Sequence, residues 1–272
     1  FDHTGSSVFS RQRRIFAQLQ SMKGINQDGY IRDASGQLVD ISNNSIIATF
    51  STDMFGTWSL NIPLSKLPDL YKIKFLPGGI DIASGKVVNT TYSNIITKAE
   101  TSLLSSNKIN ITPLTTVKSN ILESKYNENP SGNLDNFVRD SNKAVARVFD
   151  ISENEVDGDY INNENTNVMK AATKINLITQ TLTDNIAAED TSVTNDTVLS
   201  SIVNNIKNSN SKFDFSNSSN ISNIVNNVSS GVSNTVINNS SAIVTSASNN
   251  IENASGSSFV EIITDVVKTS VA

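Results

Sequence analysis

The spacing of apolar residues changes once along this chain, and the change limits what the chain can fold into. Between residues 25 and 98 the apolar residues come in short runs, and in residues 57–62 they occupy alternate positions, as on a strand with one buried face. Beyond residue 99 they recur every three or four residues, as on the buried stripe of a helix. The sequence therefore predicts an α+β protein, in which a small antiparallel β-sandwich precedes a mainly α-helical region.

The front of the chain has the pattern of a small sandwich over residues 25–98. Turn-forming residues such as Gly36, Asn44 and Gly56 separate its apolar runs. Ahead of it, residues 1–24 place apolar side chains on one face and Gln and Arg on the other, which predicts a helical arm. Within the sandwich we expect strands at residues 30–32, 37–41, 45–50, 57–62 and 70–75.

Residues 99–190 are expected to form a helical bundle. Residues 109–111 resemble a last short strand, after which Thr112 is placed to cap a helix. Pro113 would be the first residue of that helix, where its missing amide hydrogen costs nothing, and Leu114 begins an apolar stripe. Longer stripes, which predict further helices, run from Leu134 to Phe149 and from Val168 to Ile186, with a short capped turn at residues 152–155 between them.

Residues 191–272 are rich in Asn, Ser and Thr, which are weak helix formers. Apolar residues still recur there mostly three or four positions apart, so helices are the favoured interpretation, first between Val198 and Ile206. Such helices need a partner surface, and a coiled coil or a neighbouring subunit would supply one; a stacked β-fibre or partial disorder are the competing interpretations. We therefore predict a helical assembly tail, whose contacts include Ile221, Ile224, Val228, Val232 and Val236.

Composition excludes several classes of protein. With 21 basic and 26 acidic residues the net charge is -5, which argues against a nucleic-acid binder. The one basic cluster, Arg11, Arg13 and Arg14, is either a solvated helix face or a docking site for an acidic partner. The absence of cysteine excludes disulfides and thiolate metal sites. The chain also has no run of 18 apolar residues, the length that would span a membrane. A chain that opens at Phe1 suggests a processed protein or part of a longer one.

Few residues point to catalysis or metal binding. The only histidine, His3, has no partner motif near it, so a histidine-based triad or metal site is not expected. Residues 150–159 form an oxygen-rich loop that could bind calcium, but Gly158 is misplaced for an EF-hand and no Glu closes the loop. The loops at Asp28 and Asp81 raise the same question. Turn and cap chemistry is the simpler interpretation of all three, so no cofactor is expected, and Ca²⁺ is the one candidate ligand.

Residues 52–60 (TDMFGTWSL) form a recognisable hairpin. Asp53 can accept hydrogen bonds from turn amides, Gly56 can adopt a positive φ, and Trp58 would then point into the core. The segment resembles a hairpin of carboxypeptidase-regulatory-like (transthyretin-like) β-sandwiches. Such hairpins often carry Asn where this chain has Phe55, so the turn differs there or Phe55 is an exposed contact.

Two further segments, residues 78–85 (GGIDIASG) and 111–116 (ITPLTT), lie about thirty residues apart. Together they resemble a module of long bacterial adhesins and surface proteins and of structural proteins of large DNA viruses. In that module the second segment opens a small helical bundle. The resemblance implies structural roles for Gly79, Asp81, Gly85, Pro113 and Leu114.

These features predict a non-enzymatic structural protein of a virion or of a cell-surface filament. Its expected partners are copies of itself or other structural proteins of the same particle or layer. The alternative is an adhesin or carbohydrate-binding module that recognises a host-surface glycan or receptor. That alternative needs an aromatic platform, so finding Trp58 exposed beside a tyrosine would favour it, and finding Trp58 buried would favour the structural role.

Overall fold

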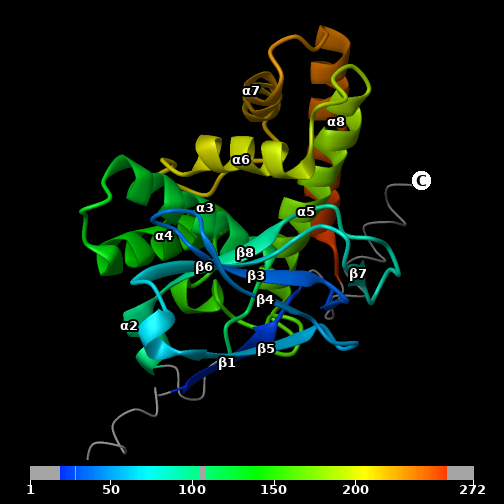
Figure 1. Ribbon diagram of the computed structural model, residues 1–272. Helices are drawn as coiled ribbons and strands as arrows, with labels where there is room; N and C mark the ends of the chain where they lie inside the picture. Colours follow the sequence, from blue (N-terminus) through cyan, green and yellow to red (C-terminus); the bar gives the residue numbers. More distant parts are fainter. Residues whose placement is uncertain (1–18, 28, 104–107, 256–272) are drawn as a thin grey trace, which may run out of the picture.

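The computed structural model describes residues 19–27, 29–103 and 108–255. Small antiparallel sheets form the front of the chain and helices form the back, with 47% helix and 19% strand (Figure 1). This confirms the predicted α+β class. Within the described residues, no helix combines the length and the apolar character needed to cross a bilayer.

A four-stranded antiparallel sheet forms the centre of the β region, with strand order β4-β3-β6-β8. Leu38 in its second strand pairs with Ala48 on one side and with Ile73 on the other, and is fully buried. Three of these strands coincide closely with predicted ones, because turn residues separate their short apolar runs. The bounds are β3 Ser35–Asp40, β4 Ile46–Ser51, β6 Leu70–Phe75 and β8 Tyr92–Thr97.

A second layer covers one face of this sheet. It consists of β1 (Leu19–Ile25) paired antiparallel with β5 (Thr57–Pro63), and residues 109–111 run parallel to β1 through hydrogen bonds from the amides of Ile109 and Ile111. Trp58 meets Phe50 and Phe75 between the layers, with ring centroids 5.1 and 6.3 Å away. Two smaller elements lie beside the layers: the pair β2 (Ile31–Arg32) and β7 (Ile80–Asp81), and the 3-10 turn η1 (Leu64–Lys66).

The prediction of a helical arm is wrong for its described part, because residues 19–24 belong to β1. Met22 and Gly24 of this strand face the sandwich core and Trp58, and an added Cβ on Gly24 would lie only 1.8 Å from the Ile109 carbonyl oxygen. The close approach of residues 109–111 to β1 therefore requires glycine here. Residues 1–18, with the rest of the predicted arm, lie outside the described residues.

Helices cover the other face of the sheet. α3 (Pro113–Glu128) begins with a capping box between Thr112 and Thr115, as predicted, and α4 (Leu134–Phe149) ends at Asp150 in the left-handed conformation. Leu122 and Val138 from these helices pack on apolar residues of the sheet and its loops. The four-stranded sheet is thus a middle layer between the β1–β5 pair and the helices α3 and α4 (Figure 1).

The inner face of α3 forms one continuous core with α4, α5, α6, α7 and α8. In Figure 1 the long helix α5 runs beside α8, with α6 crossing near its far end and α7 packed against α8. Their bounds are α2 Lys98–Leu103, η2 Glu153–Glu155, α5 Thr166–Ala187, α6 Asn195–Ile206, α7 Ser218–Val228 and α8 Asn234–Asn253.

The Asn- and Ser-rich residues up to Ala254 are helical because their caps and their burial compensate for weak propensity. Asn217 and Ser233 accept amide hydrogen bonds at the starts of α7 and α8. The partner surface expected from other subunits lies in the same chain, since Ile224 and Ile251 are fully buried in the core shared with α5. Residues 256–272 lie outside the described residues.

Candidate functional site

The turn between β4 and β5 is built as the sequence predicts. Asp53 Oδ1 accepts hydrogen bonds from the amides of Phe55 and Thr57, both at 2.9 Å, and Thr57 Oγ1 donates to Asp53 Oδ2 at 2.5 Å. Gly56 has a φ of 75°, and Trp58 is 3% exposed. The hydrogen bond from Thr57, helped by the two amides, holds the pKa of Asp53 below its ordinary value.

This turn projects two apolar side chains into solvent. Met54 is 67% exposed and Phe55 is 65% exposed. Because Asp53 fixes the backbone on both sides of them, these side chains are presented by an ordered turn. Phe55 therefore lies where the prediction of an exposed contact requires, and Met54 joins it.

A second turn, formed by residues 78–88, is likewise held by an aspartate. Asp81 accepts hydrogen bonds from the amides of Ala83 and Ser84 and from Ser84 Oγ, and the Gly85 amide donates to the Asp81 carbonyl at 2.8 Å. Gly85 has a φ of 68°. The Asp81 carboxylate is thus engaged in a turn.

Gly79 in the same segment is required by packing. An added Cβ there would lie 2.7 Å from Ile31 Cγ2 and 2.8 Å from Ala34 Cβ. The turn that follows β6 folds back along β2, and the Ile82 amide donates to the Tyr30 carbonyl at 3.0 Å.

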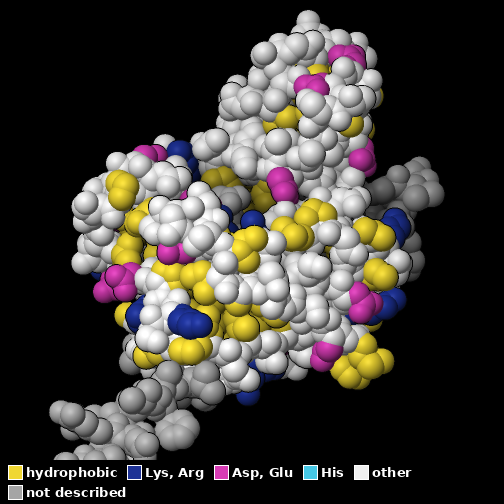
Figure 2. All heavy atoms as spheres, in the orientation of Figure 1, with side chains coloured by type: hydrophobic (Ala, Val, Ile, Leu, Met, Phe, Trp, Pro, Cys, Tyr) yellow, Lys and Arg dark blue, Asp and Glu magenta, His cyan; other side chains and the backbone are white. Residues whose placement is uncertain are grey.

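The two turns lie on either side of the segment that joins β1 to β2. An added Cβ on Gly56 would lie 3.0 Å from the Ile31 nitrogen, and one on Gly29 would lie 2.3 Å from Asp81 Oδ1. Figure 2 shows hydrophobic side chains in two places at this edge of the molecule, around β7 and beyond the end of β5, with charged side chains between them. We name this area the loop-end surface, defined by Met54, Phe55, Ile82 and Val87, which are between 44% and 67% exposed.

Sequence reasoning identified only Phe55 of these four. The signal for the others was present, since Met54, Ile82 and Val87 are large apolar residues inside segments otherwise composed of turn residues. Apolar residues at turn tips are poorly placed for burial. Their position therefore could have indicated exposure.

The Thr-rich start of α3 protects the edge of the central sheet. Thr116 Oγ1 accepts a hydrogen bond from the Ser93 amide at 2.9 Å, and Ser119 Oγ accepts one from the Ile95 amide at 2.8 Å. Thr115 Oγ1 donates to the Ser93 carbonyl at 2.8 Å. Pro113 and Leu114, in the first turn of α3, are buried. Residues 111–116 therefore have a structural role: with Ser119, they supply hydrogen-bond partners for the outer backbone groups of the edge strand β8.

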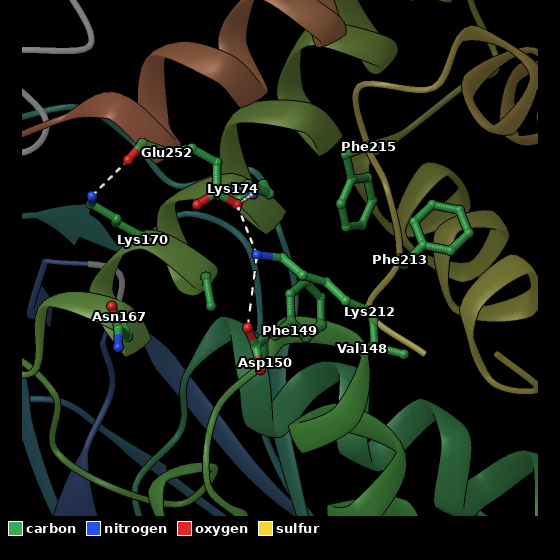
Figure 3. A pocket seen from close by; sticks show the side chains of 11 residues that line it. Val148, Phe149, Asp150, Asn167, Lys170, Lys174, Lys212, Phe213, Phe215 and Glu252 are labelled. Carbon is green, nitrogen blue, oxygen red and sulfur yellow. Dashed lines mark hydrogen bonds and ion pairs between the residues drawn. The ribbon is translucent and has the colours of Figure 1, made fainter. Parts of the chain in front are cut away.

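A small pocket of about 100 Å³ lies where α4, α5, the segment before α7 and the end of α8 meet (Figure 3). Lys174 Nζ lies 2.5 Å from Glu252 Oε1, and Lys212 Nζ lies 3.5 Å from the same oxygen and 4.0 Å from Asp150 Oδ2. Lys170 Nζ donates to the Glu252 carbonyl at 2.9 Å. Phe149 stacks on Phe215 beside them, with centroids 6.0 Å apart.

Both carboxylates of this pocket, Asp150 and Glu252, lie beside lysine side chains. Burial would raise the pKa of Glu252, but the hydrogen bond and charge of Lys174, together with Lys212, hold it below its ordinary value. Lys170 satisfies a carbonyl in the last turn of α8, where positive charge is favourable. The arrangement fastens the end of α8 to α5, which is a structural role.

The predicted assembly contacts in the tail lie in different environments. Ile221 and Ile224 are fully buried within the chain, and Val236 is 8% exposed. Val228 and Val232 are half-buried and pack against the helical core. In this structure the first three are core residues with no free surface for another subunit. Arg11, Arg13 and Arg14 lie outside the described residues.

Among the described residues, Trp58, Tyr30, Tyr71 and Tyr92 do not form an exposed aromatic platform. Trp58, Tyr71 and Tyr92 are each at most 3% exposed, and Tyr30 is half-buried. By the criterion stated above, the burial of Trp58 favours the structural role. In the described part of the chain, no three His, Cys, Asp or Glu side chains converge as a metal-binding group.

Comparison with protein-family models, curated proteins and solved structures finds no match for this chain. The resemblance to the surface-protein module and to the transthyretin-like sandwich therefore stays a prediction. The class that the fold itself defines is an α+β protein with antiparallel sheets in front of a helical region.

Proposed function

We propose that this chain is a non-enzymatic structural protein of a virion or of a cell-surface filament, and that it joins its neighbours through the loop-end surface. The observation that carries the proposal is the exposure of Met54, Phe55, Ile82 and Val87 on two adjacent turns. Exposed apolar side chains that gather in one place mark interaction sites more often than scattered ones do.

The loop-end surface is suited to binding because its backbone is already ordered. The side chains of Asp53 and Asp81 hold the two turns, and each accepts three hydrogen bonds from nearby amides and a hydroxyl. An ordered turn loses little conformational entropy when a partner covers it. Each apolar side chain that becomes fully buried contributes up to about 1.5–3 kcal/mol before ordering costs.

The partners would be copies of this chain or other structural proteins of the same particle or surface layer. A stable interface buries about 1,200–2,000 Å² in total, more than four side chains provide, so neighbouring polar residues of the turns would complete it. A host-surface receptor that offers an apolar groove is the partner that an adhesin role would require.

The titration of the carboxylates also supports a role without acid–base chemistry. A general acid that works near neutral pH needs a raised pKa. Among the described carboxylates with a shifted pKa, every shift is downward and comes mainly from hydrogen bonds or ion pairs: Asp53, Glu189, Asp190, Asp214 and Glu252.

The experiment is light scattering on the purified chain over a wide range of concentration. We expect a defined oligomer or a growing filament for the wild type, and a smaller species for the double variant Met54→Ser/Phe55→Ser. Ile243→Ser is the matched control, because Ile243 is also exposed, at 45%, but lies on α8. It should assemble like the wild type.

A wild-type chain that stays monomeric at every concentration would contradict self-association, and would leave docking on a different structural protein. Equal loss of assembly in the double variant and in Ile243→Ser would contradict the assignment of the contact to the loop-end surface.

A further inference from the structure

The loop between α4 and α5 carries two aspartates to the place where the β region meets the helices. Val156 and Tyr160, which flank them, are 1% and 2% exposed and anchor the loop in the helical core. Asp157 and Asp159 point instead toward the end of β1, toward β8 and toward α3, as their hydrogen bonds show.

Carboxamides from three separate segments meet this loop. Asn94 Nδ2 donates to Asp157 Oδ1 at 3.0 Å, and Asn110 Nδ2 donates to the Asp157 carbonyl at 2.9 Å. Gln27 Nε2 donates to Asp159 Oδ1 at 2.9 Å. The segments belong to β8, to the strand-like residues 109–111 and to the end of β1.

The rest of the polar environment is also defined. Lys118 Nζ forms an ion pair with Asp157 Oδ1, and Asp159 Oδ1 accepts further bonds from Tyr30 Oη at 3.2 Å and the Asn162 amide at 3.0 Å. Burial and the charge of Asp159 raise the pKa of Tyr30 to about 12, so its hydroxyl remains a donor at neutral pH.

The carboxamide oxygens of this cluster are unsatisfied. Gln27 Oε1, Asn94 Oδ1 and Asn110 Oδ1 have no hydrogen-bond donor among the described residues, although their side chains are 0%, 3% and 6% exposed. Each oxygen belongs to a carboxamide whose nitrogen donates a hydrogen bond to Asp157 or Asp159. A buried acceptor without a donor is unfavourable, and such groups normally bind water or an ion.

The charge of the cluster favours an ion. Asp157 and Asp159 contribute two negative charges and Lys118 one positive charge, which leaves one negative charge beside three unpaired carbonyl oxygens. Hard cations such as Ca²⁺ take six to eight oxygen ligands, drawn from carboxylates, amide carbonyls and water. We propose that Asp157 and Asp159, together with the side-chain oxygens of Gln27, Asn94 and Asn110, bind a hard metal cation of the Ca²⁺ class.

The position gives the cation a structural consequence. It would tie β1, β8 and α3 to the loop between α4 and α5, and so stabilise the junction between the β region and the helices. Because Lys118 already neutralises part of the site, the affinity should lie in the weak range of extracellular calcium modules, with Kd about 10⁻⁴–10⁻³ M.

The test uses the full chain after treatment with a chelator. Isothermal titration with Ca²⁺ should give a saturable heat, and Ca²⁺ at about a tenfold excess over Kd should raise the Tm by roughly 3–6 °C. Terbium is the optical probe. Tyr30 donates to Asp159, so excitation of tyrosine should produce sensitised Tb³⁺ emission that Ca²⁺ displaces.

Asp159→Asn is the informative variant, because its amide oxygen can still accept the bonds from Gln27, Tyr30 and Asn162. We expect it to fold, and to lose at least tenfold in Ca²⁺ affinity. Asp190→Asn is the matched control, since Asp190 is a turn aspartate bonded to Ser192 outside the cluster, and its Ca²⁺ response should equal that of the wild type.

The proposal is overturned if the wild type gives neither a heat of binding nor a change in Tm up to about 10 mM Ca²⁺. The three carboxamide oxygens would then accept hydrogen bonds from water alone. The same conclusion follows if Asp159→Asn and Asp190→Asn weaken the response equally. The wild-type titration decides the matter even if Asp159→Asn fails to fold.

Discussion

Gly56 adopts a backbone conformation that other residues rarely hold. Its φ is 75°, and an added Cβ would lie 3.0 Å from the Ile31 nitrogen and 3.1 Å from Tyr30 Cβ. We expect Gly56→Ala to lower the free energy of unfolding by about 1–3 kcal/mol, because alanine must carry both the backbone strain and the contact. Denaturant unfolding measures the change.

Gly231→Ala provides the control. Gly231 is exposed, and an added Cβ there would meet no atom within 4 Å. The substitution should be neutral or stabilising by up to about 1 kcal/mol, since alanine restricts the unfolded chain. If both variants lose the same stability, the turn geometry at Gly56 is not the cause.

Asp53 gives the stability a dependence on pH. Thr57 and two amides hold the folded-state pKa below the ordinary value of 3.8. The stabilisation from Asp53 is therefore fully present above that value and is lost as the pH falls through the lower, folded-state pKa. As the pH is lowered from 5, the free energy of unfolding should fall less in Asp53→Asn than in the wild type. Denaturant unfolding at several pH values measures this difference. An unchanged acid response would show that Asp53 contributes nothing to it.

At the scale of elements, the contact between α3 and β8 is the least ordinary feature. An edge strand normally exposes its outer amides to solvent, but here two of them meet hydroxyls of Thr116 and Ser119. Thr116→Val preserves shape and removes the acceptor, which leaves the buried Ser93 amide unpaired. We expect a loss of about 1–3 kcal/mol in the free energy of unfolding.

Thr179→Val is the matched control for that substitution. Thr179 is 2% exposed on α5, and its hydroxyl has no hydrogen-bond partner among the described residues. Replacing it should be neutral or stabilising, because no bond is lost and an unpaired polar group leaves the core. Equal destabilisation in both variants would mean that packing, and not the bond to β8, determines the effect.

The contact between α3 and β8 also explains which elements could be predicted from the sequence. The strands with alternating apolar residues, such as 57–62, were predicted, but β8 was not named as a strand. Its six residues are all buried, and they include the polar Ser93 and Asn94, of which Asn94 donates a side-chain hydrogen bond to Asp157. No period-two signal is left in such a strand. β1 was assigned to a helix because its few apolar residues also fit one helical face.

The candidate sites could be predicted from the sequence only where all their residues lie in one short segment. Asp53, Gly56 and Trp58 lie within six residues, and their roles follow from turn geometry. The loop-end surface combines two turns that are distant in sequence, and the carboxamide cluster combines residues from Gln27 to Asp159. Such combinations depend on tertiary contacts, which a local pattern does not contain.

At the scale of the whole molecule, the sequence suggested that residues 217–254 need an external partner. The structure places them in one apolar core with α3, α5 and α6. The cooperativity of unfolding distinguishes a tail that needs an external partner from one that belongs to the common core. If α8 belongs to the common core, damage to it must destabilise the β region as well, because the two regions share α3.

Ile251→Ala tests this, since Ile251 is fully buried at the end of α8. We expect a loss of about 2–5 kcal/mol, with Ile243→Ala, exposed on the same helix, within about 0.5 kcal/mol of the wild type. Trp58 is the only tryptophan and lies in the sandwich, so its fluorescence reports the β region, while far-ultraviolet circular dichroism reports mainly the helices. Both signals should shift together in Ile251→Ala. A shift in circular dichroism alone would mean that α7 and α8 unfold separately, as expected of an assembly tail that depends on a partner.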